Sequence, residues 1–183
     1  NPSWIAYDVL AQGEHDPNAK TYVIAKNKNI LLKVKNELQR IMKETKLKNV
    51  DRSIKNNCYL ILAKSQKEIF EITNFIAPEH LHIHEKFNKN MLKNIINAGS
   101  VFLGERSPVA LGDYTMGTNH VLPTDQTAKF SSGLGVEDYT KKTVFIKLGN
   151  KTLKKIAKPT INLARQEGLE AHALSVEIRK IKT

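Results

Sequence analysis

The sequence predicts an α/β fold with parallel strand neighbours, followed by a small and mainly helical C-terminal segment. Over residues 1–134, short apolar runs typical of buried strands alternate with amphipathic stretches typical of helices. Hydrophobic residues make up 40% of the 183 residues, which is enough to bury a core. The stretch 135–183 is too short to hold a core of its own, so we expect it to lean on the first domain or on another chain.

Apolar spacing and capping residues predict the elements of the first domain in chain order. Asn1 and Pro2 are typical of a helix start, and Asp16-Pro17-Asn18 of its end. Ser65 with Glu68 forms a capping box for a later helix. The expected helices cover residues 3–15, 28–46, 65–76 and 90–97, and the expected strands cover residues 21–25, 58–63, 81–84 and 100–103.

The periodicity fails after Gly104, and residues 105–135 read as a long loop with four glycines and two prolines. A loop of that length inside a compact domain is usually functional. Beyond it we expect a strand over 143–148, a helix over 151–166 and, after a break at Gly168, a last helix over 169–181.

The composition excludes several classes of protein. The net charge is +11, but the basic residues are almost all lysines spread along the chain, so a nucleic-acid partner is not expected. No run approaches the ~18 apolar residues of a membrane helix, so we expect no membrane partner and a cytoplasmic protein. Cys58 is the single cysteine, which excludes a disulfide framework and a multi-thiolate zinc site.

Two pairs of residues are candidates for chemistry. Gln12 and His15 are three residues apart at the end of the first expected helix and so share a face. Glu79 and His80 follow Pro78 at a helix-to-strand corner, where a carboxylate and an imidazole can divide acid and base roles. From the residues alone, the ordinary interpretation is favoured for both pairs: a surface glutamine with a helix-end histidine, and a surface turn with incidental charges.

Further candidates lie later in the chain. Asp113 sits in the glycine-containing loop, and His172 sits in the last helix near Glu167. Zinc accepts a set of Gln12, His15, Asp113 and His172, although no rule of spacing brings them together. His82 and His84 alternate on a short strand, and we interpret them as strand and edge residues rather than as a metal pair.

Several motifs make the chain resemble the C-terminal part of histidinol dehydrogenase, the NAD-dependent enzyme of histidine biosynthesis. The resemblance runs almost the full length of the chain, and its blocks follow the family's order. They are LAQGEHDP at 10–17, APEHL at 77–81, NAGSVFLG at 97–104, SPVALGDY at 107–114, GTNHVLPT at 117–124, FSSGL at 130–134 and EGLEAH at 167–172.

The resemblance implies oxidation of L-histidinol to L-histidine through L-histidinaldehyde, with NAD as the oxidant and one zinc ion per site. Carried over by position, the zinc ligands are Gln12, His15, Asp113 and His172, and these also contact the substrate. Glu79 is implied to activate water, and His80 to be a general base that also touches substrate. Glu167 is implied to be a further substrate contact.

The resemblance also implies a homodimer with intertwined C-terminal segments, so that 135–183 of one chain completes the partner's site. Family members are more than twice as long, and the chain starts with Asn, so we expect a fragment with an incomplete Rossmann-like domain. Residues that bind NAD stay unknown, since no glycine-rich fingerprint follows a strand. A non-catalytic, dimeric fragment that binds zinc and histidinol is therefore the alternative.

One departure from the family concerns the first motif. Gly13 stands where the family commonly has alanine, and glycine inside a helix costs ~1 kcal/mol relative to alanine.

Overall fold

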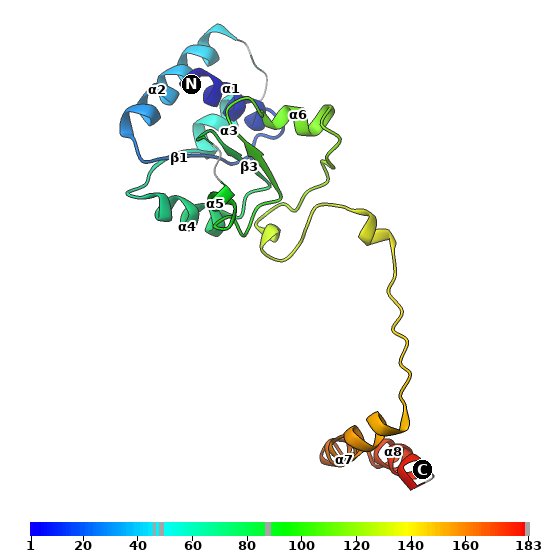
Figure 1. Cartoon of the computed structure of the whole chain (residues 1–183). Helices are drawn as coiled ribbons and strands as arrows, with labels where there is room; N and C mark the ends of the chain where they lie inside the picture. The colour runs from blue at the N-terminus through cyan, green and yellow to red at the C-terminus, as the bar shows by residue number, and fades with distance from the viewer. Residues whose placement is uncertain (46, 48–49, 87–88, 182–183) are drawn as a thin grey trace. The chain divides into compact units, whose positions relative to one another are not determined.

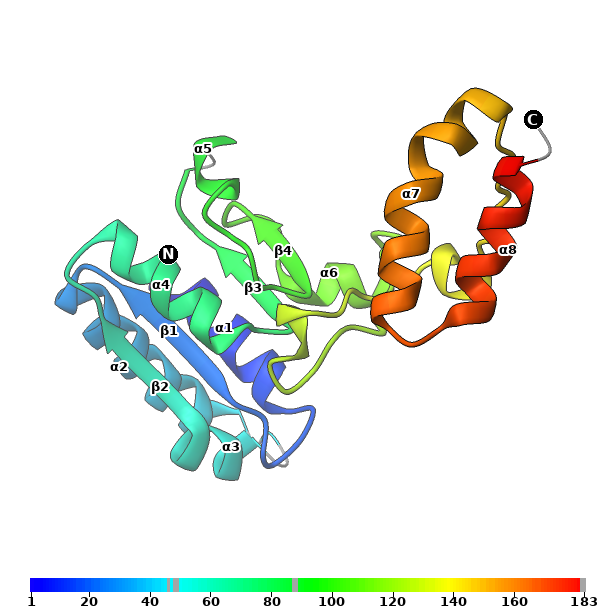
Figure 2. The ribbon, with the colours of Figure 1, turned by 90° about the horizontal axis from the view of Figure 1, so that it is seen from below.

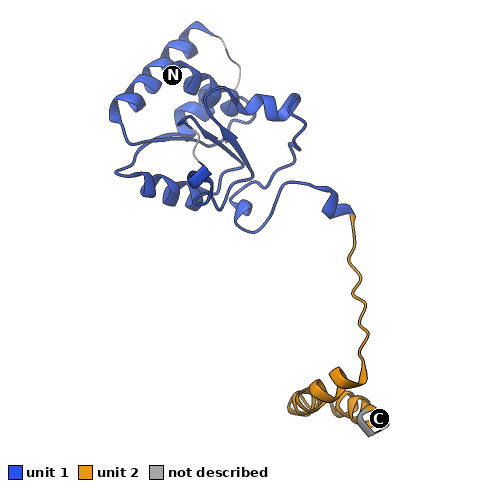
Figure 3. Cartoon of the chain, in the orientation of Figure 1, with its two compact units in different colours: residues 1–139 blue, residues 140–183 orange. Residues whose placement is uncertain are grey.

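A computed structural model describes residues 1–45, 47, 50–86 and 89–181, and it divides the chain into two compact units. The first unit covers residues 1–139 and the second covers residues 140–183 (Figure 3). The sequence suggested a boundary after residue 134. None of the helices that the structure describes has both the length and the apolar character needed to cross a membrane.

The main core of the first unit lies between its first three helices and the first strand pair. Helix α1 (Pro2–Gly13), helix α2 (Lys28–Glu44) and helix α3 (Val50–Asn57) lie on one side of strand β1 (Thr21–Ala25), and helix α4 (Gln66–Ile76) lies on the other (Figures 1 and 2). The apolar residues of α2 at helical spacing are Ile30, Leu31, Val34, Leu38 and Ile41, and all of them except Ile30 are buried. The fully packed side chains are Ala6, Val9, Leu10, Val23, Leu31, Val34, Leu38, Ile41 and Val50.

The helices begin where side chains cap them. Asn1 accepts a hydrogen bond from the Ser3 amide at 3.0 Å, with Pro2 in the first turn as predicted. Ser65 likewise accepts from the Glu68 amide at 3.1 Å, and the Glu68 carboxylate accepts from the Lys64 amide. The predicted capping box is thus present, with its return bond one residue earlier than usual.

The strands among the described residues form two separate parallel pairs instead of one continuous sheet. Strand β1 pairs with β2 (Cys58–Leu62), and β3 (His80–Ile83) pairs with β4 (Ser100–Leu103). The register sets Thr21 beside Cys58 and His80 beside Ser100. Helix α5 (Lys89–Leu92) is shorter than predicted. The parallel α/β class is confirmed, and it puts His80 at the start of a strand.

Two helices were not predicted. Helix α3 has only eight residues, which are mostly polar, and its buried residues are Val50 and Ser53, so too few apolar positions mark it as a helix. Helix α6 (Val109–Tyr114) lies within residues expected to form a loop, because Gly112 obscured its pattern. Two short 3-10 turns, η1 (Thr127–Lys129) and η2 (Val136–Tyr139), complete the unit. The predicted helix over 28–46 ends at Glu44, and residue 46 lies outside the described residues.

The second unit is a helical hairpin with a small core of its own, which corrects the expectation that this stretch is too short to hold one. Helix α7 (Asn150–Gln166) and helix α8 (Glu170–Ile181) bury Ala157, Ile161 and Ala173 between them. Gly168 makes the turn with a φ of 76°, as the predicted break requires. The Arg165 guanidinium donates to the carboxylates of Glu170 and Glu177 and ties the two helices together.

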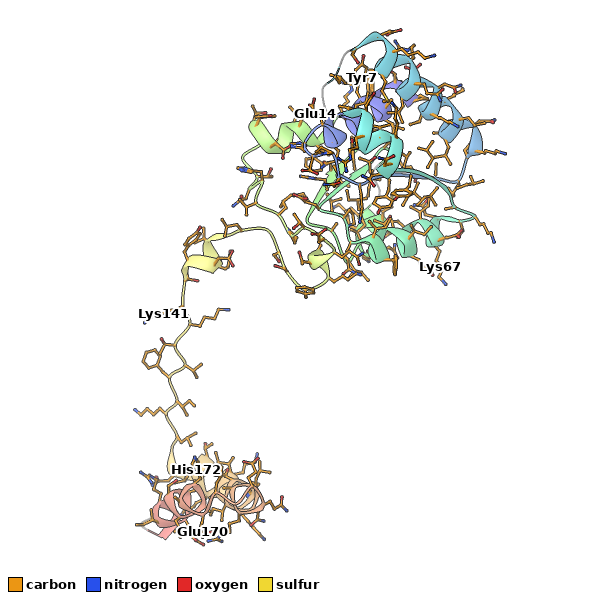
Figure 4. The ribbon with its side chains drawn as sticks, turned by 180° about the vertical axis from the view of Figure 1, so that it is seen from behind. Tyr7, Glu14, Lys67, Lys141, Glu170 and His172 are labelled. Atoms are coloured by element: carbon orange, nitrogen blue, oxygen red, sulfur yellow. The ribbon has the colours of Figure 1, made fainter. Side chains whose placement is uncertain are left out.

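The strand predicted over 143–148 is wrong. Residues 140–149 form no helix or strand, and the side chains around Lys141 project from an extended backbone (Figure 4). Phe145 is 91% exposed, and Val144 and Ile146 are nearly as open. A strand needs a hydrogen-bonding neighbour, and no described residue of this chain supplies one.

Candidate active site

The corner between α4 and β3 holds Glu79 and His80. Ala77 ends α4 in the left-handed conformation with a φ of 47°, which is costly for alanine and is held by its full burial. The Gly99 amide donates to the Pro78 carbonyl at 3.0 Å, and the Ser100 amide donates to the Glu79 carbonyl at 2.8 Å. Hydrogen bonds from the first residue of β4 and from the residue before it therefore fix the backbone on both sides of Glu79.

The imidazole of His80 has no hydrogen-bond partner among the described residues. Its side chain is 12% exposed, and both ring nitrogens are buried with no hydrogen bond to any described residue. The nearest carboxylate oxygen is Oδ1 of Asp113, 3.8 Å from Nε2, which is beyond hydrogen-bond reach. Buried polar atoms are normally satisfied, so an unsatisfied ring points to a group that binds there.

Asp113 reaches His80 from helix α6. The helix approaches β4 closely at Gly112, where an added Cβ would lie 2.7 Å from two ring carbons of Phe102. The Thr118 hydroxyl donates to the Gly112 carbonyl at 3.0 Å. Asp113 thus stands on a helix, not in the loop that the sequence suggested, and its side chain is 20% exposed.

Gln12 and His15 lie at the end of α1. The helix stops at Gly13, so His15 follows it and is not on its last turn, which corrects the predicted shared helix face. Gln12 is half-buried and His15 is exposed. This end of α1 is anchored to α3, because the buried Ser53 hydroxyl donates to the Gly13 carbonyl at 2.7 Å.

Glu167 and His172 belong to the second unit. Glu167 caps α7, and its amide donates to the Leu163 carbonyl at 3.0 Å. His172 is exposed on α8, close in sequence to Glu170 (Figure 4). The predicted zinc ligands are therefore divided between the two units, and the complete set stays a prediction.

A different cluster, formed by Asp8, His82 and His84, was not predicted. The Asp8 Oδ2 atom lies 3.1 Å from His82 Nδ1 and 3.4 Å from His84 Nε2, and the two imidazole rings are 3.9 Å apart. Within the described part of the chain, this is the group of three His, Cys, Asp or Glu residues whose ligand atoms all lie within 4.8 Å of one another. The signal in the sequence was the alternation of two histidines, which puts both side chains on one face of a strand.

The Asp8 carboxylate and the His82 imidazole shift each other's pKa. Burial raises the pKa of Asp8, but hydrogen bonds and charge from His82 and His84 outweigh burial and hold that pKa below its ordinary value. Burial lowers the pKa of His82, but Asp8 and the Gly104 carbonyl outweigh it and hold the pKa above its ordinary value. An ionised carboxylate therefore faces the two imidazoles.

Comparison with known proteins identifies one family. The family model described as histidinol dehydrogenase matches residues 1–180. Curated proteins named histidinol dehydrogenase from Listeria monocytogenes and Methanocaldococcus jannaschii are each 43% identical over 180 residues. Those matches cover 98% of this chain and 42% of each relative, so the chain spans about two fifths of their length.

A solved structure agrees in fold. The crystal structure of histidinol dehydrogenase from Elizabethkingia anophelis superposes with a TM-score of 0.88 at 31% identity. The match covers 98% of this chain and 41% of that one.

Proposed function

The chain belongs to the histidinol dehydrogenase family, and from this premise we propose that it carries the acid–base and metal-binding residues for NAD-dependent oxidation of L-histidinol to L-histidine through L-histidinaldehyde. The observation that supports this most directly is the corner where His80 presents two unsatisfied ring nitrogens beside Glu79 and opposite Asp113. Such groups are what a reaction with two proton transfers requires.

In the first oxidation, His80 takes the hydroxyl proton of the alcohol while a hydride leaves the carbon that carries this hydroxyl. Its free nitrogens suit this role, because no described residue competes for them. In the second oxidation, Glu79 takes a proton from the water that adds to the aldehyde. The hydrate then loses a hydride from its carbon and a proton from one hydroxyl to solvent, which gives the carboxylic acid. Two NAD molecules would accept one hydride each, and we assign no residue of this chain to NAD.

The donor set of Gln12, His15, Asp113 and His172 suits zinc. It combines an amide oxygen, a carboxylate and two imidazoles, which are the oxygen and nitrogen ligands that zinc accepts. Gln12 is half-buried and His15 is exposed, so both side chains remain accessible to a ligand. A zinc ion held by these residues would fix the pose of the substrate. The same four residues, with His80 and Glu167, are proposed to contact L-histidinol.

We propose that the active form is a cytoplasmic homodimer in which residues after 135 are exchanged. Glu167 and His172 lie on a separate compact unit, preceded by an extended stretch with exposed apolar side chains. The hairpin has a small core of its own, and the extended stretch before it exposes apolar side chains. This combination suits docking on a second copy of the chain. In this arrangement His172 completes the zinc site of the partner.

The test is calorimetric titration of L-histidinol into the purified chain, with zinc and after chelation. We expect zinc-dependent binding that is lost in His15→Ala and Asp113→Asn. The variant Asp51→Asn serves as the control, because this exposed carboxylate pairs only with Lys55 among the interactions described. L-alaninol, which lacks the imidazole, should not bind.

The outcomes separate the candidates. Binding together with NADH formation on addition of NAD supports the dehydrogenase. Binding without NADH formation supports the alternative, a dimeric fragment that binds zinc and histidinol without catalysis. Equal heats with and without zinc, or full binding by His15→Ala, would overturn the assignment of the ligands.

A further inference from the structure

Asp8, His82 and His84 form a second constellation, on residues that the proposed reaction does not use. We propose that these three side chains bind a transition-metal ion of the zinc class, at a site distinct from the one formed by Gln12, His15, Asp113 and His172. Asp8 comes from α1, whereas the two histidines come from β3 and the residue after it. The ion therefore joins two elements that are 74 residues apart in the sequence.

The spacing of the ligand atoms fits such an ion. Zinc–nitrogen and zinc–oxygen bonds of about 2.0–2.1 Å at tetrahedral angles put neighbouring ligand atoms roughly 3.3 Å apart. Asp8 Oδ2 lies 3.1 Å from His82 Nδ1 and 3.4 Å from His84 Nε2. All three ligand atoms lie within 4.8 Å of one another, so small side-chain adjustments bring them around one centre.

The hydrogen bonding of His82 gives independent support. Its Nε2 lies 2.9 Å from the Gly104 carbonyl, which can only accept, so Nε2 carries a hydrogen. In the neutral ring Nδ1 is then a bare lone pair, directed at the Asp8 carboxylate. Either a second proton or a metal ion must lie between them. A metal-bound histidine whose other N–H donates to a backbone carbonyl is the usual outer-shell arrangement.

His84 brings a third ligand atom to the cluster. A single carboxylate oxygen faces both imidazoles, and the centroids of the two rings are 3.9 Å apart. One ion bound to both neutral rings would satisfy the carboxylate and the two nitrogens together, and an ion pair of Asp8 with a protonated His82 is the alternative that the experiment separates from it. The side chains are 8%, 22% and 21% exposed for His82, Asp8 and His84, so water competes only weakly.

Solvent reaches the cluster from the side of Asp8. A pocket of about 280 Å³ includes this carboxylate and is also lined by Trp4, Tyr7, Glu105, Arg106 and Pro108. Asp8 is one helical turn before Gln12, and His82 is two residues after His80, so the ion would fasten α1 to β3 and hold the two ends of the proposed active site in place. Its role is structural positioning.

The experiment measures metal bound by the whole chain in the His15→Ala background, where the proposed substrate-site metal is lost. Zinc and cobalt are titrated, with metal content after dialysis and cobalt d–d absorption as readouts. We expect one ion per chain to remain. Adding His84→Gln should weaken it by at least the ~10–100-fold that loss of an outer-shell partner costs. Asp8→Asn, similar in shape, should act likewise.

A second readout does not depend on those variants folding. Imidazole ¹⁵N spectra of the His15→Ala chain should show zinc-induced shifts at His82 Nδ1 and His84 Nε2. The proposal would be overturned if zinc left the imidazole ¹⁵N chemical shifts unchanged, or if His84→Gln left the metal affinity unchanged. The cluster would then be a hydrogen-bonded Asp8–His82 pair. Failure of L-histidinol binding would instead refute the proposed function and leave this result unaffected.

Discussion

Ser53 donates its buried hydroxyl to the Gly13 carbonyl over 2.7 Å and so fastens α3 to the end of α1 that carries Gln12. The contact leaves no room for a side chain. A Cβ on Gly13 would lie 2.8 Å from Ser53 Oγ and 3.0 Å from Ile54 Cδ1. The glycine that stands where the family commonly has alanine is therefore explained by the close approach of α3.

We expect Gly13→Ala to destabilise the first unit, although alanine is the better helix former by ~1 kcal/mol. Ser53 is buried and hydrogen-bonded, so its hydroxyl cannot move aside cheaply. Ser53→Ala alone should cost about 1–3 kcal/mol through the lost bond. In the Ser53→Ala background, Gly13→Ala should cost at least ~1 kcal/mol less than in the wild type. Urea unfolding of the four proteins measures this coupling, and strictly additive effects would contradict it.

Gly99→Ala should disturb the Glu79–His80 corner. A Cβ at this position would lie 2.6 Å from the Glu79 carbonyl oxygen and 3.1 Å from Pro123 Cδ. Neither atom belongs to a flexible side chain, so the backbone at Glu79 must shift. We expect about 1–3 kcal/mol of lost stability and weaker zinc-dependent binding of L-histidinol.

Gly149→Ala is the matched control for that change. Nothing lies within 4 Å of its Cβ position, and its φ of −92° suits alanine. We expect ligand binding and the unfolding of the first unit to stay near wild type. The second unit alone should lose about 0.5–1 kcal/mol, because Gly149 is the N-cap of α7 and alanine is a poorer N-cap than glycine. Equal effects of the two substitutions would show that the crowding at Gly99 is not what matters.

Asn74 fixes the turn before β4 from the last part of α4. Its side chain accepts from the amides of Ile96 and Asn97 at 2.9 and 3.2 Å and donates to the Asn94 carbonyl at 2.8 Å. Asn74→Ala leaves these groups without their partner, and we expect a loss of about 2 kcal/mol. Hydrogen exchange should accelerate at the amides of residues 96 and 97. Asn36→Ala, on the exposed face of α2, should leave both measurements unchanged.

Local signals explain which parts of the fold the sequence could predict. Helix α2 has an apolar stripe, α4 has its capping box, and β1 is a short apolar run between turn residues, so each was predicted with its type. Helix α3 was missed because its burial comes from Ser53 and Val50 meeting α1, which is a tertiary contact. The strand predicted over 143–148 failed because strand pairing depends on a neighbour, and apolar alternation carries no information about one.

The candidate site divides in the same way. Pro78 marks the corner that presents Glu79 and His80, so a local rule located it. The approach of Asp113 to His80 and of Asp8 to His82 joins residues more than 30 positions apart, and no spacing rule gives such contacts. Resemblance to a family supplied the role of Asp113. The cluster at Asp8 lies outside the matched motifs, and only the structure revealed it.

The apolar stretch 144–146 should determine whether the chain dimerises. Phe145 is 91% exposed, with Val144 and Ile146 at 81% and 79%, and exposed groups of this size side by side are costly in water. In the proposed dimer a second chain covers them, so Phe145→Asp introduces a charge into that interface and should shift the protein to monomer. Sedimentation equilibrium measures the shift, and Phe75→Asp, at a 73% exposed phenylalanine of α4, is the control. Because His172 then no longer reaches a partner, Phe145→Asp should also lose zinc-dependent histidinol binding. A Phe145→Asp protein that stays dimeric would show that this stretch lies outside the interface.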